Sequence, residues 1–204
     1  MPPTASDVSI RLATMDDLPA LRTLIETSVR ALSVGYLSPQ EIEAQLRFVV
    51  GPDTQLIADG TYYVAVAPDG SLAGAGGWSR RRALHGGDQY KAALAAGDVG
   101  DRSLGDPDAL LDPAAEPARI RAMFTSPAWA RRGVGRRLFE AARAAAAAAG
   151  FRRLVLTATL PGVPLYAALG FRADRRYVDR LPNGAAIPLV EMSRPIGAAT
   201  AQAQ

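Results

Sequence analysis

The sequence lacks cysteine altogether and contains a single histidine, His85. The absence of cysteine excludes disulfide bonds, thiolate metal sites and a cysteine nucleophile, and we expect no metal. No apolar run approaches the length of about 18 residues that a membrane-spanning helix needs, so we expect no membrane association. The N-terminus has no basic segment followed by an apolar core, which argues against a secretory signal and favours a cytoplasmic location.

The composition is that of an ordinary globular protein, with 49% hydrophobic and 21% charged residues in a chain of 204. This length predicts one domain over residues 1–196, followed by a mobile tail at residues 197–204. The net charge of +3 reflects arginines that occur in clusters, such as Arg80 to Arg82. A nucleic-acid surface needs a basic face with interleaved aromatic residues, so we expect no nucleic-acid partner.

Local patterns predict most of the secondary structure. A strand at residues 8–12 precedes a helix at 14–30, and a second helix at 39–49 begins with the cap Ser38 and the capping-box acid Glu41. Two hairpins are expected, at residues 61–67 with 71–79 and at residues 175–181 with 187–194. Glycines in the strand at 71–79 indicate bulges or a close approach of the backbone to a neighbour.

A long connection, at about residues 83–117, separates the first hairpin from the rest of the chain. It carries a short helical candidate near residues 89–96. Residues 86–116 include seven acidic residues against Lys91 and Arg102. We predict a mobile surface rim near the active site that attracts a cationic substrate, with a solvated loop as the alternative.

The most informative segment spans residues 120–171. An apolar strand at residues 120–125 ends at Ser126-Pro127, and the loop Arg131-Arg132-Gly133-Val134-Gly135-Arg136 opens an alanine-rich helix that ends at Gly150. A second strand at 151–159 leads to Tyr166-Ala167-Ala168-Leu169-Gly170-Phe171. Free N–H groups in a glycine loop at a helix start attract a phosphate, and the helix dipole adds to this attraction.

These residues resemble the GNAT superfamily of acyl-CoA-dependent N-acetyltransferases, whose pattern is V-x-P-x-x-[QR]-x-x-G-x-[GA] with a later Tyr-x-x-x-Gly-Phe. Pro127 lies six residues before Gly133, and Gly135 takes the final small position. Three positions differ from the pattern. Thr125 stands where the family usually has Val, Ala130 where it has Gln or Arg, and Thr159 where Asn is common.

The resemblance implies an α/β (α+β) fold with a mixed, mostly antiparallel sheet of about six to seven strands. The sheet would be splayed between strands four and five and flanked by about four helices. Acetyl-CoA would be the co-substrate, with Tyr166 protonating the departing thiolate. The implied cofactor-binding residues are Met123, Phe124 and Thr125 at the strand edge, Arg131, Arg132, Gly133, Val134, Gly135 and Arg136 in the phosphate loop, and Thr159.

The general base and the acceptor remain open at this level. Candidate bases are His85, Glu26, Glu116 and Asp88, and water relays are the alternative. Side chains that could line an acceptor pocket are Trp78, Tyr36, Tyr90 and Arg82, although Trp78 fits a core position equally well. The junction of the first two helices, at residues 32–37, is expected to overhang the acceptor site.

The favoured function is acetyl transfer to a primary amine, carried by either a small molecule or a peptide. A homodimer is a possible assembly. A non-catalytic acyl-CoA sensor or interaction module on the same fold is the alternative. A nucleotide-binding βαβ unit is disfavoured, because the loop has neither the full G-x-G-x-x-G nor the Lys-[ST] of a P-loop.

Overall fold

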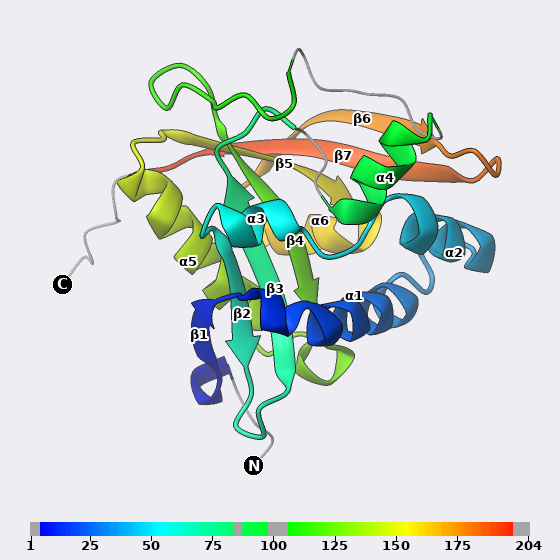
Figure 1. Ribbon diagram of the computed structural model, residues 1–204, viewed down its shortest axis with the longest axis horizontal. Helices are drawn as coiled ribbons and strands as arrows, with labels where there is room; N and C mark the ends of the chain where they lie inside the picture. The colour runs from blue at the N-terminus through cyan, green and yellow to red at the C-terminus, as the bar shows by residue number, and fades with distance from the viewer. Residues whose placement is uncertain (1–4, 84–86, 98–105, 198–204) are drawn as a thin grey trace.

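The computed structural model describes residues 5–83, 87–97 and 106–197 (Figure 1). His85, part of the predicted acidic rim and nearly all of the expected tail therefore lie outside the described residues. Within the described part of the chain, no helix is both long and apolar enough to cross a bilayer.

A single mixed sheet forms the centre of the protein. The described strands are β1 (Ser9–Leu12), β2 (Tyr62–Val66), β3 (Leu72–Ser79), β4 (Ala118–Thr125), β5 (Arg153–Thr159), β6 (Arg172–Arg180) and β7 (Ala186–Pro195), in the order β1-β2-β3-β4-β5-β7-β6. Every neighbouring pair is antiparallel except β4 and β5, which are parallel. The expected mixed, mostly antiparallel sheet of about six to seven strands is confirmed, with seven strands in the described residues.

Six α-helices occur in the described residues, rather than the about four expected: α1 (Leu18–Leu32), α2 (Pro39–Phe48), α3 (Thr54–Ala58), α4 (Asp88–Ala95), α5 (Val134–Ala148) and α6 (Val163–Ala168). The sequence pattern missed α3 because five residues are too few to show a helical period. The capping box of α2 is confirmed, since the Ser38 hydroxyl accepts from the Glu41 amide and the Glu41 carboxylate accepts from the Ser38 amide.

Helices cover the sheet on both faces. On one face α5 buries Phe139 and Ala142 against Leu154 and Leu156 of β5. On the other face α1 buries residues such as Leu21 in one cluster with Tyr62 and Val64 of β2. Figure 1 shows α1 and α3 in front of strands β2 to β4, with α5 on the far side. Burying each large apolar side chain contributes about 1.5–3 kcal/mol, so these two layers fix the sheet between them.

Candidate active site

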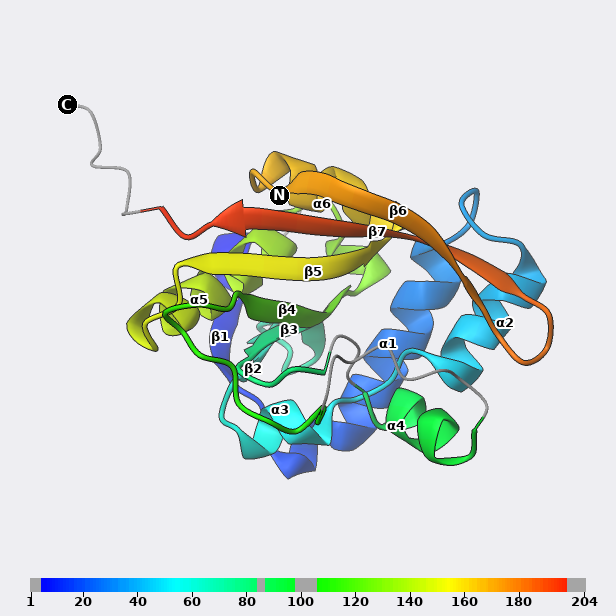
Figure 2. The same ribbon diagram turned by 90° about the horizontal axis from the view of Figure 1, so that it is seen from above.

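Strands β4 and β5 separate soon after they meet. Their parallel pairing consists of Ala118 with Leu154 and Arg119 with Val155, and it does not extend beyond Arg119. From Leu156 to Thr159, β5 continues to pair with β7 on its other side. The rest of β4 therefore has one edge whose backbone N–H and C=O groups do not pair with β5. Figure 2 shows the two strands from above.

A bulge in β4 marks the point of separation. On β3 the pairing steps from Ala75 to Gly77, while on β4 it steps from Phe124 to Arg121, so β4 carries one extra residue. Ala122 sits inside this step with φ of 54°, in the left-handed region that is strained for alanine. Met123, Phe124 and Thr125 follow the bulge and are half-buried. The structure thus places all three predicted strand-edge residues on the unpaired part of β4.

The loop between β4 and α5 holds its shape through two left-handed residues and one buried aromatic. Arg131 and Gly133 have φ of 63° and 88°, and Gly133 is the N-cap of α5. Trp129 is buried in the same cluster as Val134 and Leu138, which fixes the loop to the start of the helix. The first N–H groups of α5 have no intrahelical acceptor, so the loop presents free donors at the positive end of the helix dipole.

Two arginines of this loop face solvent at the helix start. Arg131 and Arg136 are exposed, and the Arg132 guanidinium lies 5.8 Å from the centre of the Trp129 ring. Arg137 instead donates to the Val8 carbonyl at 2.7 Å and ties α5 to the residue that precedes β1. The loop therefore combines backbone donors with exposed positive charge, as an anion site requires.

Gly135 lies where the loop, the β4 edge and α6 meet. A β-carbon at Gly135 would lie 3.1 Å from Cδ2 of Leu165 and 3.7 Å from Oγ1 of Thr125. The first distance is tight, so the Leu165 side chain would have to shift by a few tenths of an ångström to admit a β-carbon. This close approach brings the predicted phosphate loop next to the helix that carries Tyr166.

Tyr166 is buried on the face of the sheet that α5 covers. Its ring packs edge-on against Phe171 with centroids 5.8 Å apart, in a cluster that includes Leu156 and Ala158 of β5. Burial raises the pKa of the Tyr166 phenol well above its ordinary value of 10.0. Among the described residues no hydrogen bond to its hydroxyl occurs, so the proton is not committed to a neighbour. Thr159, at the end of β5, precedes α6 by one short turn.

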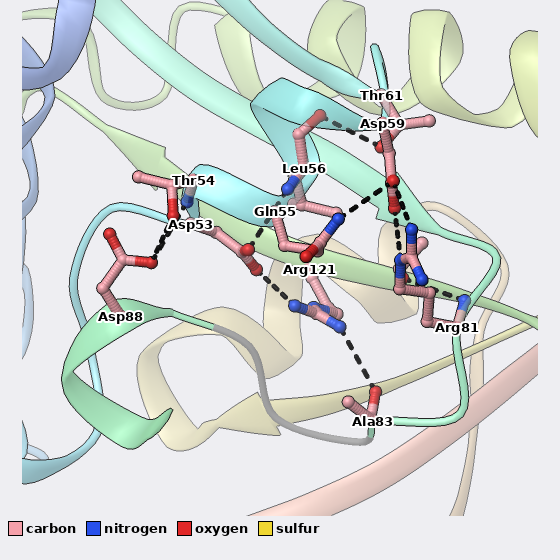
Figure 3. Close-up of polar contacts among 11 residues, drawn as sticks. Asp53, Thr54, Gln55, Leu56, Asp59, Thr61, Arg81, Ala83, Asp88 and Arg121 are labelled. Carbon is pink, nitrogen blue, oxygen red and sulfur yellow. Dashed lines mark hydrogen bonds and ion pairs between the residues drawn. The ribbon is translucent and has the colours of Figure 1, made fainter. Parts of the chain in front are cut away.

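An ion pair supports the opposite face of β4. Arg121 contacts Asp53 through its Nη2 atom and donates from Nη1 to the Ala83 carbonyl at 3.3 Å (Figure 3). Asp53 is fully buried and also accepts from the Leu56 amide at 3.2 Å, which caps α3. Sequence reasoning missed this pair, because nothing near Asp53 in the sequence indicates a partner in β4.

The candidate bases that the structure describes already have partners. Glu26 contacts Arg30 at 3.0 Å, Glu116 contacts Arg82 at 3.2 Å, and Asp88 accepts from the Thr54 hydroxyl at 2.8 Å. These contacts single out no base.

The candidate acceptor residues are scattered. Trp78 is a core residue, stacked edge-on against Phe151 with centroids 5.8 Å apart, and Tyr90 is buried. Tyr36 is 49% exposed at the junction of α1 and α2, and Leu37 of the same junction joins a cluster against which Phe124 packs. Leu37 and Phe124 thus share one apolar cluster, while the overhang of the acceptor site by residues 32–37 stays a prediction and Trp78 is not free to line a pocket. The acidic rim stays a prediction, although Asp106 and Asp112 accept hydrogen bonds from backbone amides in local turns.

Comparison with known proteins agrees with this geometry. The profile of the family described as Acetyltransferase (GNAT) domain matches residues 95–173, which include the loop and Tyr166. No curated protein matches the sequence. A GCN5-related N-acetyltransferase from Rhodopseudomonas palustris has a similar structure, with a TM-score of 0.62 at 18% identity over 92% of this chain and 95% of that chain.

Two further similar structures were solved with cofactor. The PaiA N-acetyltransferase from Thermoplasma acidophilum, in complex with coenzyme A, has a TM-score of 0.58 at 14% identity over 92% of this chain and 98% of that one. A GNAT superfamily phosphinothricin acetyltransferase from Sinorhizobium meliloti, in complex with acetyl-CoA, has a TM-score of 0.54 at 21% identity over 97% and 92%. At these identities the structural likeness establishes the fold.

Residues 95–173 match the GNAT acetyltransferase domain, and the splayed, mostly antiparallel sheet is the fold of GNAT N-acetyltransferases. The domain match and the fold support an acyltransferase enzyme of the acetyltransferase type.

Proposed function

We propose that this protein transfers the acetyl group of acetyl-CoA to a primary amine by direct attack in a ternary complex. The observation that carries the proposal is the meeting of three segments around Gly135. They are the open edge of β4 at Thr125, the start of α5, and α6 with Leu165 beside Tyr166. An acyl donor with a long amide-bearing arm and a pyrophosphate needs an unpaired strand edge and an anion site next to each other.

The proposed cofactor contacts follow from the exposed donors and acceptors. The backbone groups of Met123, Phe124 and Thr125 lie on the edge that β5 leaves free, and they would pair with the amides of the pantetheine arm. The amides of the loop from Arg131 to Arg136 would bind the pyrophosphate, with the two exposed arginines adding charge-assisted contacts. Thr159 lies at the end of β5, on the part of that strand that does not pair with β4, and we include it among the proposed contacts.

The proposed reaction needs no covalent enzyme intermediate. The neutral amine nitrogen attacks the thioester carbonyl and forms the C–N bond, and the C–S bond then breaks. The amine loses one proton to water or to a base, while the Tyr166 hydroxyl gives its proton to the leaving thiolate. The phenolate is then reprotonated from solvent, so the enzyme returns to its starting state and the products are an acetamide and coenzyme A.

The burial of Tyr166 supports this role. Its raised pKa keeps the phenol protonated throughout the neutral range, so the acid form is always available. The same burial disfavours a thiolate formed beside it, because a low-dielectric setting penalises any isolated anion. The proton transfer neutralises the thiolate and places the charge on the phenolate, which burial also disfavours, so reprotonation of the phenolate from solvent completes the step.

The decisive experiment incubates the protein with acetyl-CoA and a panel of primary amines. Released thiol is measured, and the amines are checked for acetylation by mass spectrometry. We expect stoichiometric thiol and acetylated amine for at least one member. Binding of acetyl-CoA by calorimetry with no product from any amine would contradict the proposal and favour the sensor function.

A further inference from the structure

Arg119 occupies the vertex of the splay. It is the last residue of β4 that pairs with β5, opposite Val155, and it pairs with Ser79 of β3 on its other side. Alternate residues of a strand point to the same face, so Arg119 shares the face of Arg121, while Ala118 and Ile120 join the cluster of α5 and Tyr166 on the other face. Thr157 and its β7 partner Glu191 continue this face across the gap between the strands.

Arg119 differs from the other cations described on this face. Arg121 is paired with Asp53, Arg82 with Glu116, and Arg175 of β6 with Glu191. In the part of the chain that the structure describes, Arg119 has no carboxylate within ion-pair distance. Its Nε atom is shielded from solvent and has no hydrogen-bond partner, while its terminal nitrogens are not fully shielded.

Such an arrangement is costly for the folded protein alone. Burial lowers the pKa of Arg119 below the ordinary arginine value, and the more distant charges of Glu116 and Glu191 only partly offset this effect. A guanidinium offers five donors in a planar fork that matches a carboxylate, and a half-buried fork with no partner leaves these donors unused. Unpaired charges of this kind are typical of ligand sites.

We propose that Arg119 binds a carboxylate of the acceptor, so that the substrate class is amines that also carry a carboxylate, as amino acids do. This inference rests on the proposed acetyl transfer. The acceptor would approach from the face opposite Tyr166, which leaves the α5 side to the acyl donor. Arg119 precedes the bulge at Ala122 by three residues, which is about 10 Å along a strand and within the combined reach of the arginine side chain and a small substrate.

A carboxylate fits better than a phosphate. One unpaired guanidinium balances one negative charge. The carboxylates of Glu116 and Glu191 lie close enough to act on Arg119 and would repel a dianion.

The test compares amino acids with their carboxamides as acceptors in the wild type and in Arg119→Gln. We expect the ratio of kcat/KM for acid over amide to fall about ten- to hundred-fold in the variant, the range for losing a hydrogen bond to a charged group. Comparing this ratio between variants cancels the different basicity of the two amines. Arg119→Lys should give an intermediate ratio, because it keeps the charge and loses the fork.

Arg172→Gln is the matched control. It makes the same charge change at an exposed position of β6, in the row of paired residues across the sheet that includes Arg119. The ratio of kcat/KM for acid over amide should stay as in the wild type. Thermal unfolding provides a second readout. Arg119→Gln should melt at or above the wild-type temperature, because it removes an unpartnered buried charge.

The outcomes separate the two proposals. Equal use of acid and amide by the wild type, or an unchanged ratio in Arg119→Gln, would overturn the role of Arg119 while leaving acetyl transfer intact. A lower melting temperature with an unchanged ratio would show that the side chain only supports the fold. No transfer to any acid or amide, with acetyl-CoA still bound, would overturn the proposed function and this inference together.

Discussion

Asp53 and Arg121 form an ion pair that is shielded from solvent on both sides, and Arg121 immediately precedes the bulge at Ala122. The pair joins the loop before α3 to the strand edge proposed to bind the cofactor, and Figure 3 shows the guanidinium between Asp53 and the Ala83 carbonyl. This ion pair holds the first half of β4 near α3, while the second half of β4 diverges from β5. The pair therefore supports the geometry of the splay.

Asp53→Asn should destabilise the protein by about 3–5 kcal/mol, because it leaves Arg121 as an uncompensated buried charge. Asparagine still caps a helix, so the cap of α3 survives and the effect isolates the charge. Urea unfolding measures the change. Asp53→Asn combined with Arg121→Met should lose less than the sum of the single variants. Additive losses would show that the two side chains act independently.

Tyr166→Phe should keep the fold and the affinity for acetyl-CoA, while kcat falls about a hundred- to ten-thousand-fold. The hydroxyl has no described partner, so its removal leaves the packing of the ring intact. Tyr62→Phe is the control, since it removes another buried hydroxyl that has no partner, on the opposite face of the sheet. A loss of less than about threefold, with chemistry rate-limiting, would assign Tyr166 to packing.

Gly133→Asp should weaken acetyl-CoA binding, measured by calorimetry, because it brings a side chain and a negative charge into the phosphate loop. Gly150→Asp is a close control at the other end of the same helix. Gly150 also has a left-handed φ of 90°, so both variants carry comparable backbone strain. Equal affinities in the two variants would place the pyrophosphate elsewhere.

Stability against acid should depend on Asp17, which pairs with Arg11 at 2.7 Å and accepts from the Thr14 amide at 2.8 Å. The Arg11 hydrogen bonds and the Thr14 amide lower the pKa of Asp17 from 3.8 to about 2. A lowered folded-state pKa gives stability that is complete above pH 3.8 and is lost as the pH falls through about 2.

Asp17→Asn should therefore cost about 1–2 kcal/mol at neutral pH, a range that allows for solvent around Arg11. The difference from the wild type should vanish near pH 2 in unfolding titrations. Asp16→Asn, at the exposed neighbouring position, makes the same charge change and should have little effect. A constant difference across the acid range would mean that Asp17 acts through packing.

Local features of the sequence determined much of the architecture. The hairpin of β2 and β3, the Ser38 cap and the loop at the start of α5 each depend on residues a few positions apart, so their patterns are visible without the fold. The spacing of Pro127, Gly133 and Gly135 indicated the family for the same reason. Helix α3 escaped notice because it is short and depends on one capping carboxylate.

The tertiary structure decided which side chains meet at the splay. Asp53 and Arg121 are separated by 68 residues, and no local pattern connects them. Ala122 is an ordinary strand residue in the sequence, and its left-handed backbone arises only because β3 and β4 pair out of step. The unpaired state of Arg119 depends on where carboxylates from β7 and from the chain before β4 come to lie, and only long-range packing sets those positions.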